Sequence, residues 1–352
     1  MRTTLHKILL LAFAMAIAVT ASAQDERFSQ SYANPLRINP AIMGANHDIK
    51  FGLNYRSQWA FVDKGFKTYS FTALCPMMLK DQKGKFDAGI NVMNDKAGGF
   101  ATTDMMLALD YSKEISPNNN LCLSITGGYI QKSFDMANQT FDAQYVNGKF
   151  DASNPANEGN LSNKVSHADL GFGFTWFYNP NRTDGKINAY LGIAGYHLNQ
   201  PKQSLLGADA RLPMRFSYQA GVRIFGTNKF DLSPSIRVNN QNGNVEPAAG
   251  LYAEYSFNPT LKFVIGGWYR VHDANAIVVG FTHTNFTLGY SYDMLNNGLN
   301  DAKGNIKAHE ISLSIKINRG VKGNPNATTD EVEKEILNDA KAKDYSDPFM
   351  AF

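Results

Sequence analysis

Apolar and polar residues alternate along most of the chain between residues 48 and 318, and this period of two is typical of β-strands. In HEISLSIKIN (309–318), four aliphatic residues alternate with polar ones. FTLGYSYD (286–293) and DIKFGLNYR (48–56) repeat the pattern. One face of each segment therefore meets apolar surroundings and the other face polar surroundings.

Turn-forming residues divide this alternation into fourteen predicted strands. Most of them reach the length of about 9 to 11 residues that a tilted strand needs to cross a bilayer. An even number of strands is also typical of bacterial single-chain barrels. The predicted strands cover residues 48–59, 66–78, 84–95, 101–115, 119–134, 166–179, 184–199, 213–226, 229–240, 245–257, 260–271, 274–283, 285–295 and 308–318.

The connections between these strands predict how a barrel would lie in the membrane. If the first strand runs outward, the three long connections (135–165, 200–212 and 296–307) all fall on the outer side. The connections on the other side are short, as periplasmic turns of outer-membrane barrels are. We therefore expect an all-β, transmembrane antiparallel β-barrel with both chain ends in the periplasm. A soluble β-sandwich or jelly roll would also give alternating strands, but it does not explain the side on which the long loops fall.

One strand contains a residue that disturbs pairing. Pro234 lies inside FDLSPSIRV (230–238), where a proline removes a hydrogen bond from the sheet. The sequence therefore predicts a β-bulge at Pro234.

The first 23 residues have the features of a secretory signal peptide. Arg2 and Lys7 precede an apolar stretch, and the small residues ASA (21–23) follow it, so that the mature protein would begin at Gln24. No cysteine follows the cleavage site, which argues against a lipid anchor. Beyond the leader, no apolar run approaches the roughly 18 residues of a transmembrane helix.

Residues 24–47 form a separate N-terminal segment before the barrel of residues 48–318. The stretch QSYANPLRINPAIMG (30–44) contains two Asn-Pro pairs, and proline restricts the residue before it to extended or turn conformations. The segment should therefore be neither a long helix nor a pairing strand. Its apolar side chains could pack inside the barrel as a plug or against the periplasmic mouth; these are Phe28, Tyr32, Leu36 and Ile38.

Charge and cysteine content exclude several classes of function. Without Arg2 and Lys7, 32 basic residues remain against 31 acidic ones, which is no footprint for nucleic acid. Cys75 follows the apolar register of its strand and Cys122 the polar register of another, so we expect two free thiols. The chain contains no CxxC, HExxH, GxSxG or P-loop pattern, so no metal, cofactor or catalytic residue is predicted.

Two features of the sequence permit functions other than a purely structural barrel: an enzyme or a channel. His272 and Asp273 form an outer-loop pair that an outer-membrane hydrolase could use, although no second acidic pair at matching height can be identified. A barrel of fourteen strands also encloses more space than its wall side chains fill, which permits a passive solute channel. Against a channel, the predicted lumen carries both signs of charge, which favours cross-lumen pairing or a filled interior; these residues are Lys50, Arg56, Asp87, Asp110, Arg215, Arg223, Arg237, Glu254, Arg270, Asp293 and Lys316.

Seven short motifs, in this order and spacing, resemble those of the PorP/SprF family of outer-membrane proteins, which act in type IX secretion and gliding motility of Bacteroidota. They are NPLRINPAIMG (34–44), YRSQW (55–59), NDKAGG (94–99), LSPS (232–235), GGWYR (266–270), LGYSYD (288–293) and HEISL (309–313). The signature residues carried over from this resemblance are Asn34, Pro35, Asn39, Pro40, Gly44, Arg56, Gln58, Trp59, Asn94, Gly98, Pro234, Trp268, Arg270, Gly289, Tyr290, Tyr292, Asp293, His309 and Glu310. Ala308 and Ile42-Met43 depart from the family pattern without affecting the assignment.

The resemblance implies a non-enzymatic helper in the outer membrane. Its expected partners are other secretion or gliding proteins, and for some members of the family a secreted surface adhesin. The C-terminal tail (319–352) contains a capping-box pattern at Thr328 and Glu331, which predicts a short helix. It ends in DPFMAF, where Phe349, Met350 and Phe352 could anchor the tail in a groove of a periplasmic partner.

Overall fold

The structure is a computed structural model of the chain. It describes residues 25–45, 48–59, 65–78, 84–136, 139–146, 148–155, 163–179, 187–205, 209–227, 229–258, 260–296 and 307–317. The predicted signal peptide and C-terminal tail lie outside these residues.

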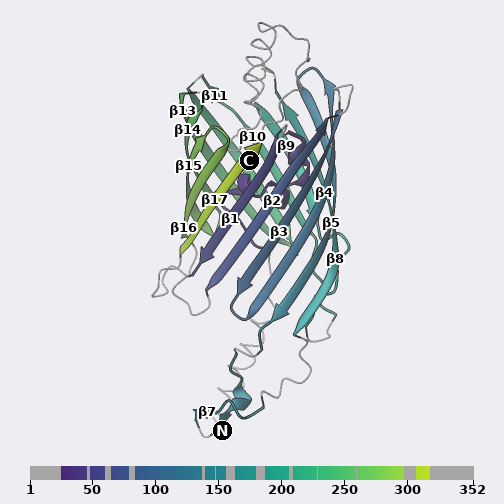
Figure 1. Cartoon of the computed structure of the whole chain (residues 1–352), viewed down its shortest axis with the longest axis vertical. Coiled ribbons are helices and arrows are strands. Elements are labelled where there is room, and N and C mark those ends of the chain that lie inside the picture. The colour runs from purple at the N-terminus through teal and green to yellow at the C-terminus, as the bar shows by residue number, and fades with distance from the viewer. Residues whose placement is uncertain are drawn as a thin grey trace.

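Fourteen long antiparallel strands form a closed barrel (Figure 1), which confirms the predicted fold. They are β1 (Ile49–Gln58), β2 (Phe66–Met78), β3 (Gly84–Ala97), β4 (Phe100–Ser116), β5 (Asn119–Phe134), β8 (Lys164–Tyr178), β9 (Ala189–Tyr196), β10 (Arg215–Val222), β12 (Phe230–Gln241), β13 (Asn244–Asn258), β14 (Leu261–Arg270), β15 (Ala274–His283), β16 (Phe286–Leu295) and β17 (Lys307–Ile317). Pairing of β1 with β17 and of β10 with β12 closes the wall.

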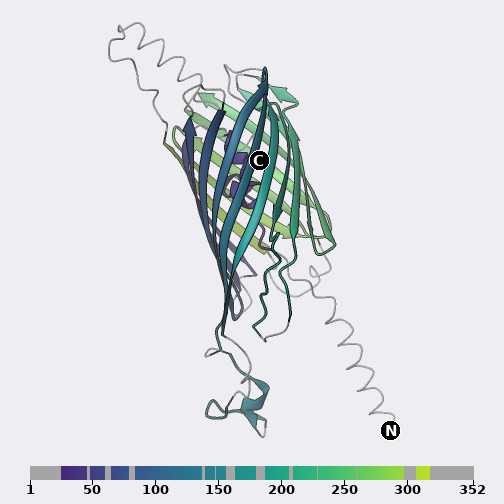
Figure 2. The same cartoon turned by 90° about the vertical axis from the view of Figure 1, so that its right-hand side faces the viewer.

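The remaining strands are short. β11 (Phe225–Gly226) pairs with the first part of β12. β6 (Tyr145–Val146) and β7 (Lys149–Phe150) form a hairpin after the 3₁₀ turn η4 (Asp142–Gln144). This hairpin lies beyond one end of the barrel in both views (Figures 1 and 2).

The wall strands face the membrane with apolar side chains and the lumen with polar ones. Along β5, for example, Leu123 and Ile125 are exposed, whereas Ser124 and Thr126 are buried. Aromatic pairs lie near both ends of the barrel, with the Trp59 ring in tilted contact with Phe66 at one end and Phe86 with Tyr111 at the other. An apolar outer band with aromatic girdles and a polar interior is the arrangement of transmembrane β-barrels.

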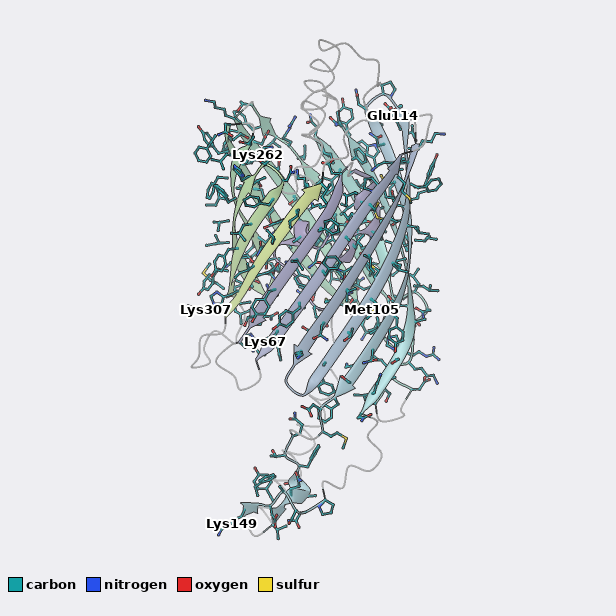
Figure 3. The ribbon with its side chains drawn as sticks, viewed as in Figure 1. Lys67, Met105, Glu114, Lys149, Lys262 and Lys307 are labelled. Atoms are coloured by element: carbon teal, nitrogen blue, oxygen red, sulfur yellow. The ribbon has the colours of Figure 1, made fainter. Side chains whose placement is uncertain are left out.

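The two ends of the barrel differ in their connections. The long connections leave the end at which Lys67 and Lys307 lie, and Glu114 and Lys262 mark the end with short turns (Figure 3). The hairpin residue Lys149 lies beyond the long-loop end (Figure 3). In the part of the chain that the structure describes, no helix is long and apolar enough to span a membrane.

Residues 25–45 run through the lumen from the long-loop end toward the short-turn end (Figure 2). Asp25 bonds to Gln241 at the last residue of β12, and Ile317 ends β17 at the short-turn end. The first and last described residues therefore lie at opposite ends of the barrel. The strand pattern predicts both chain ends on the short-turn side, since strand direction alone does not reveal a segment that crosses the lumen before β1; the chain ends themselves lie outside the described residues.

Three 3₁₀ turns make up much of this lumen segment: η1 (Ser31–Ala33), η2 (Pro35–Arg37) and η3 (Pro40–Ala45). Pro35 and Pro40 each open a turn, where a missing N–H costs no hydrogen bond. Asn39 caps the third turn, since its Oδ1 accepts from the N–H of Ala41 at 3.0 Å. The Asn-Pro pairs thus break the segment into short turns, as their backbone restrictions imply.

The apolar side chains of the lumen segment pack against the inner wall. Phe28, Tyr32, Leu36 and Ile38 are all buried. One cluster joins Tyr32 and Ala33 to Tyr252, Val264, Trp268, Ala276 and Val278. A second cluster joins Leu36 and Met43 to Leu74, Met106, Ala108, Ala194 and Tyr196. The segment therefore supplies an internal core to a barrel whose wall side chains alone would leave space.

The β-bulge predicted at Pro234 is confirmed, and its extra residue lies on the partner strand: between the pairs Gly221–Ser235 and Phe225–Leu232, residues 222–224 lie opposite residues 233 and 234. On the β13 side, by contrast, β12 pairs in unbroken register through Pro234 and Leu251. On its other side β12 pairs with β10 as far as Ser235 and with β11 from Leu232. Pro234 thus lies where β12 changes partners, and there the ladder loses least from a missing N–H.

The two cysteines lie on strands that are not adjacent. Cys75 is on β2 and Cys122 on β5, and both are free thiols. Cys122 is buried and its side chain lies against Gly44 of the lumen segment, where an added Cβ would meet the Cys122 Sγ atom.

We predict that the long-loop end faces the cell exterior. A protease recognition sequence inserted after Ser153 should be cut on intact cells, because this residue lies in the connection that leaves that end. The same sequence inserted after Asn118, in the turn between β4 and β5, should be cut only once the outer membrane is permeabilised. Cutting after Asn118 in intact cells, with Ser153 protected, would reverse the orientation.

Candidate functional site

A buried ion-pair network lies beside the lumen segment, near the long-loop end. Arg56 on β1 donates to Asp293 on β16 at 2.7 Å and to Glu310 on β17 at 3.1 Å. Arg270 on β14 donates to the same Asp293 oxygen at 2.6 Å. Glu310 has no exposed surface. The network therefore joins four wall strands, and each of these four residues belongs to one of the motifs YRSQW, GGWYR, LGYSYD and HEISL.

The lumen segment completes this network. The backbone N–H groups of Ser29 and Gln30 donate to the two carboxylate oxygens of Glu310 at 2.8 and 2.9 Å. The Ser29 hydroxyl donates to Asp293 at 2.7 Å. Asn54 on β1 also donates to Glu310, at 2.8 Å. The carboxylates of the wall thus bind the segment directly, together with donors from the wall itself.

Such a network stabilises the seated segment only while all its members are present. Two charges that leave water lose hydration energy, and their attraction compensates only when the geometry is good and further hydrogen bonds are made. Removing one partner of a buried pair typically costs about 3–5 kcal/mol, because the other charge stays buried and unpaired. Displacing Ser29 and Gln30 would leave Glu310 short of two donors.

The two asparagines of the Asn-Pro pairs anchor the middle of the segment. Asn34 Oδ1 accepts from Ser70 and Thr72 on β2, at 2.6 and 2.9 Å. Asn39 Nδ2 donates to the carbonyl oxygen of Phe174 on β8 at 2.9 Å and to Gln219 on β10 at 3.1 Å. These contacts reach opposite parts of the wall, so the segment spans the lumen.

Glycines in the wall allow the segment to approach closely. A Cβ added to Gly289 on β16 would overlap the Tyr32 hydroxyl and Gln30 Oε1. A Cβ added to Gly52 on β1 would overlap the carbonyl oxygen of Ala33. Any larger residue at either position would have to displace the segment.

A histidine between two carboxylates holds the start of the segment at the long-loop end. His197 follows β9 and is buried, with Nε2 2.8 Å from Asp25 Oδ2 and Nδ1 2.8 Å from Asp169 Oδ1. Arg215 approaches the same oxygen of Asp25 at 2.9 Å. Burial alone would lower the pKa of His197, but Asp25 and Asp169 outweigh it and raise this pKa to about 9. Burial likewise opposes ionisation of Asp25, yet His197 and Arg215 hold its pKa well below the usual range.

Several signature residues lie outside the anchor network. Gln58 accepts from Arg56 Nε at 2.9 Å, and the Trp268 ring lies 4.8 Å from the Arg237 guanidinium. Tyr290 and Tyr292 face the membrane beside His309, which shares a hydrogen bond of 2.8 Å with the Tyr290 hydroxyl. The remaining signature residues shape turns or strand ends: Trp59 and Gly98 have positive φ, and Asn94 donates to Thr103.

The outer-loop pair does not form a catalytic arrangement. Asp273 Oδ2 lies 3.4 Å from Arg27 and 3.4 Å from Arg270, so it pairs with arginines. His272 is the turn residue before it and has φ of 56°. Among the described residues, no group of three or more His, Cys, Asp or Glu side chains could hold a metal ion.

Several charged residues of the lumen pair with one another or with the segment. Lys85 contacts Asp87 at 3.0 Å, Arg37 of the segment contacts Asp104 at 2.6 Å, and Lys262 contacts Glu254 at 3.6 Å. Part of the mixed charge noted in the sequence therefore forms ion pairs inside the barrel.

Sequence reasoning missed some of the residues that hold the segment. Ser29, Gln30, Asp25, Asp169 and His197 belong to no recognised motif. Their roles depend on which residues of distant strands face one another across the lumen, and no local sequence pattern predicts these contacts. Phe349, Met350 and Phe352, the proposed docking residues, lie outside the described residues.

Comparisons with known proteins agree with this architecture. The family described as type IX secretion system membrane protein PorP/SprF matches residues 20–315. The toluene transporter TodX of Pseudomonas putida is similar in fold, with 11% identity, a TM-score of 0.51, and coverage of 85% of this chain and 100% of TodX. A TodX variant lacking S2 and S3, a monoaromatic hydrocarbon channel, gives 10% identity, a TM-score of 0.52, and coverage of 81% and 94%. The comparison with curated proteins gives no match.

The histidine contact predicts a pH-dependent stability. A pKa raised from 6.5 to about 9 means that protonated His197 contributes its full stabilisation below pH 6.5, and that this contribution is lost as pH rises through 9. The thermal midpoint of the wild type in detergent should exceed that of His197→Gln at low pH, and the difference should shrink between pH 6.5 and 9. A difference that stays constant over this interval would contradict the assigned charge state.

Proposed function

The chain belongs to the PorP/SprF family of type IX secretion system membrane proteins, and from this premise we propose that it supports the export or surface retention of secreted proteins. In this role it is a non-enzymatic outer-membrane component that acts by binding partners. The observation that carries the proposal is the occupied lumen: Glu310, Asp293, Asn34 and Asn39, which the sequence predicts to be signature residues, hold residues 25–45 inside the barrel.

An occupied lumen argues against the alternative of a passive solute channel. The anchors of the segment come from β1, β2, β8, β10, β16 and β17, which are distributed around the wall. The fold neighbours that transport hydrocarbons share only the architecture at their level of identity. The alternative of a hydrolase loses its support because Asp273 pairs with arginines rather than with His272.

The β6–β7 hairpin is the surface that we assign to an exported partner. Tyr145, Val146 and Phe150 are about half exposed, and the rings of Tyr145 and Phe150 lie 5.6 Å apart. Aromatic residues are enriched among the anchors of protein interfaces. The hairpin lies away from the barrel at the long-loop end, so it could meet a secreted protein or adhesin outside the cell (Figure 2). On the opposite side, Phe349, Met350 and Phe352 remain our proposed contact for periplasmic components.

Deletion of the gene, followed by quantification of secreted and surface proteins, tests the role in secretion. Loss of many exported proteins would identify a component of the core apparatus, and loss of one would identify a dedicated partner. Unchanged secretion, surface display and gliding would refute the proposed function.

The double variant Tyr145→Ser/Phe150→Ser tests the hairpin itself. It should retain the barrel in the membrane and lower the export or retention of the same proteins, because it removes the exposed rings. Lys202→Ala is the matched control, since Lys202 is an exposed residue of another long connection at the same end. Normal export with the double variant would exclude the hairpin as the contact surface.

A further inference from the structure

A cavity lies between the lumen segment and the inner wall, close to the long-loop end. Its volume is about 60 Å³, whereas one water molecule requires about 10–15 Å³ on the same measure. The segment lines one side through residues 26–29, 31, 34, 37 and 38, and strands β10, β12, β13 and β14 line the other. The space is large enough for a group of a few heavy atoms.

Positive charge dominates the lining of this cavity. Two glutamates, Glu26 and Glu246, also line it. The arginines of the lining are Arg27, Arg37, Arg215, Arg237 and Arg270. Four of them have carboxylate partners: Glu246 for Arg27, Asp104 for Arg37, Asp25 for Arg215 and Asp293 for Arg270.

Arg237 is the exception. Its Nη2 donates to the Ser31 hydroxyl at 2.8 Å, and its guanidinium lies 4.8 Å from the centre of the Trp268 ring. Its Nε is buried without a hydrogen-bond partner. Among the described residues, no carboxylate forms an ion pair with Arg237. A buried guanidinium without a counter-charge is costly, so the site favours an anion.

Further buried atoms of the lining also lack partners, and they too are hydrogen-bond donors. Arg37 Nη2 and Asn34 Nδ2 make no hydrogen bond, although the side chain of Arg37 is only 10% exposed and Asn34 only 1%. Within the described lining, no acceptor is left unpartnered in the same way. Unpartnered donors thus belong to both the segment and the wall of this cavity.

We propose that this cavity binds a compact oxyanion, a carboxylate or phosphate group, between the lumen segment and the barrel wall. Arginine presents a planar set of donors that matches the oxygens of either group. The anion would be held by Arg237 from β12 and by Arg37 and Asn34 from the segment. Because the ligand contacts both parts, it stabilises the seated segment, and this site is independent of the role proposed in secretion.

Thermal unfolding of the purified full-length protein in detergent tests the site. Sodium phosphate and sodium acetate are each compared with sodium chloride at equal ionic strength. A ligand that binds only the folded state raises its stability, so at least one oxyanion should raise the midpoint above the chloride value. The larger of the two shifts identifies the preferred group. No shift beyond that in chloride would overturn the proposal.

Arg237→Gln should weaken anion binding, because it removes a charge-assisted contact. The oxyanion concentration that gives a set rise in the thermal midpoint should increase by about tenfold or more. Arg223→Gln is the matched control, since Arg223 is a buried arginine that contacts Asp231 at the other end of β12 and lies outside the cavity lining. An unchanged response in Arg237→Gln would overturn the site.

A second variant keeps the test decisive if Arg237→Gln does not fold. Ser31→Asp places a carboxylate beside Arg237, where the Ser31 hydroxyl now lies. This variant should fold without added oxyanion and should lose the response to phosphate and acetate. A Ser31→Asp protein that still responds as the wild type does would contradict a site at Arg237.

Discussion

The structure depends on one constraint: the polar interior of a 14-stranded barrel must find hydrogen-bond partners. Glu310 is the clearest example, since it is fully buried and receives bonds from Arg56, Asn54 and the backbone of residues 29 and 30. A lumen filled only with water would satisfy such groups without fixing any geometry. A chain segment satisfies them at defined points, and it thereby fixes its own position and couples it to four wall strands.

The fold could be predicted from the sequence because its physical cause is local. Each strand separates lipid from the lumen, so the period of two is repeated in every strand. The long connections fall at one end of the barrel. The edges of β9 and β10 were less well predicted, since Ala189–Tyr196 and Arg215–Val222 are shorter than the alternation suggested. The bulge at Pro234 could be predicted from the proline itself, but that the extra residue lies on the partner strand is a property of the assembled sheet.

The candidate site could be predicted only in part. The motifs that suggested a family include Arg56, Arg270, Asp293 and Glu310, but nothing in their spacing shows that they meet around Ser29. That meeting depends on the closure of β1 against β17 and on the direction in which the segment enters. The same direction explains why the start of the segment lies at the long-loop end, beside His197. A site assembled from both ends of the chain leaves no local pattern in the sequence.

The central claim is that residues 25–45 block the lumen, and electrical conductance in planar bilayers tests it most directly. Wild-type protein should carry little steady current. Gly289→Leu should carry a much larger one, because its side chain takes the space of Tyr32 and Gln30. Gly127→Leu is the control, since a Cβ at Gly127 meets nothing within 4 Å, and it should remain as closed as the wild type. A large constitutive current from the wild type, or equal currents from all three proteins, would contradict the account.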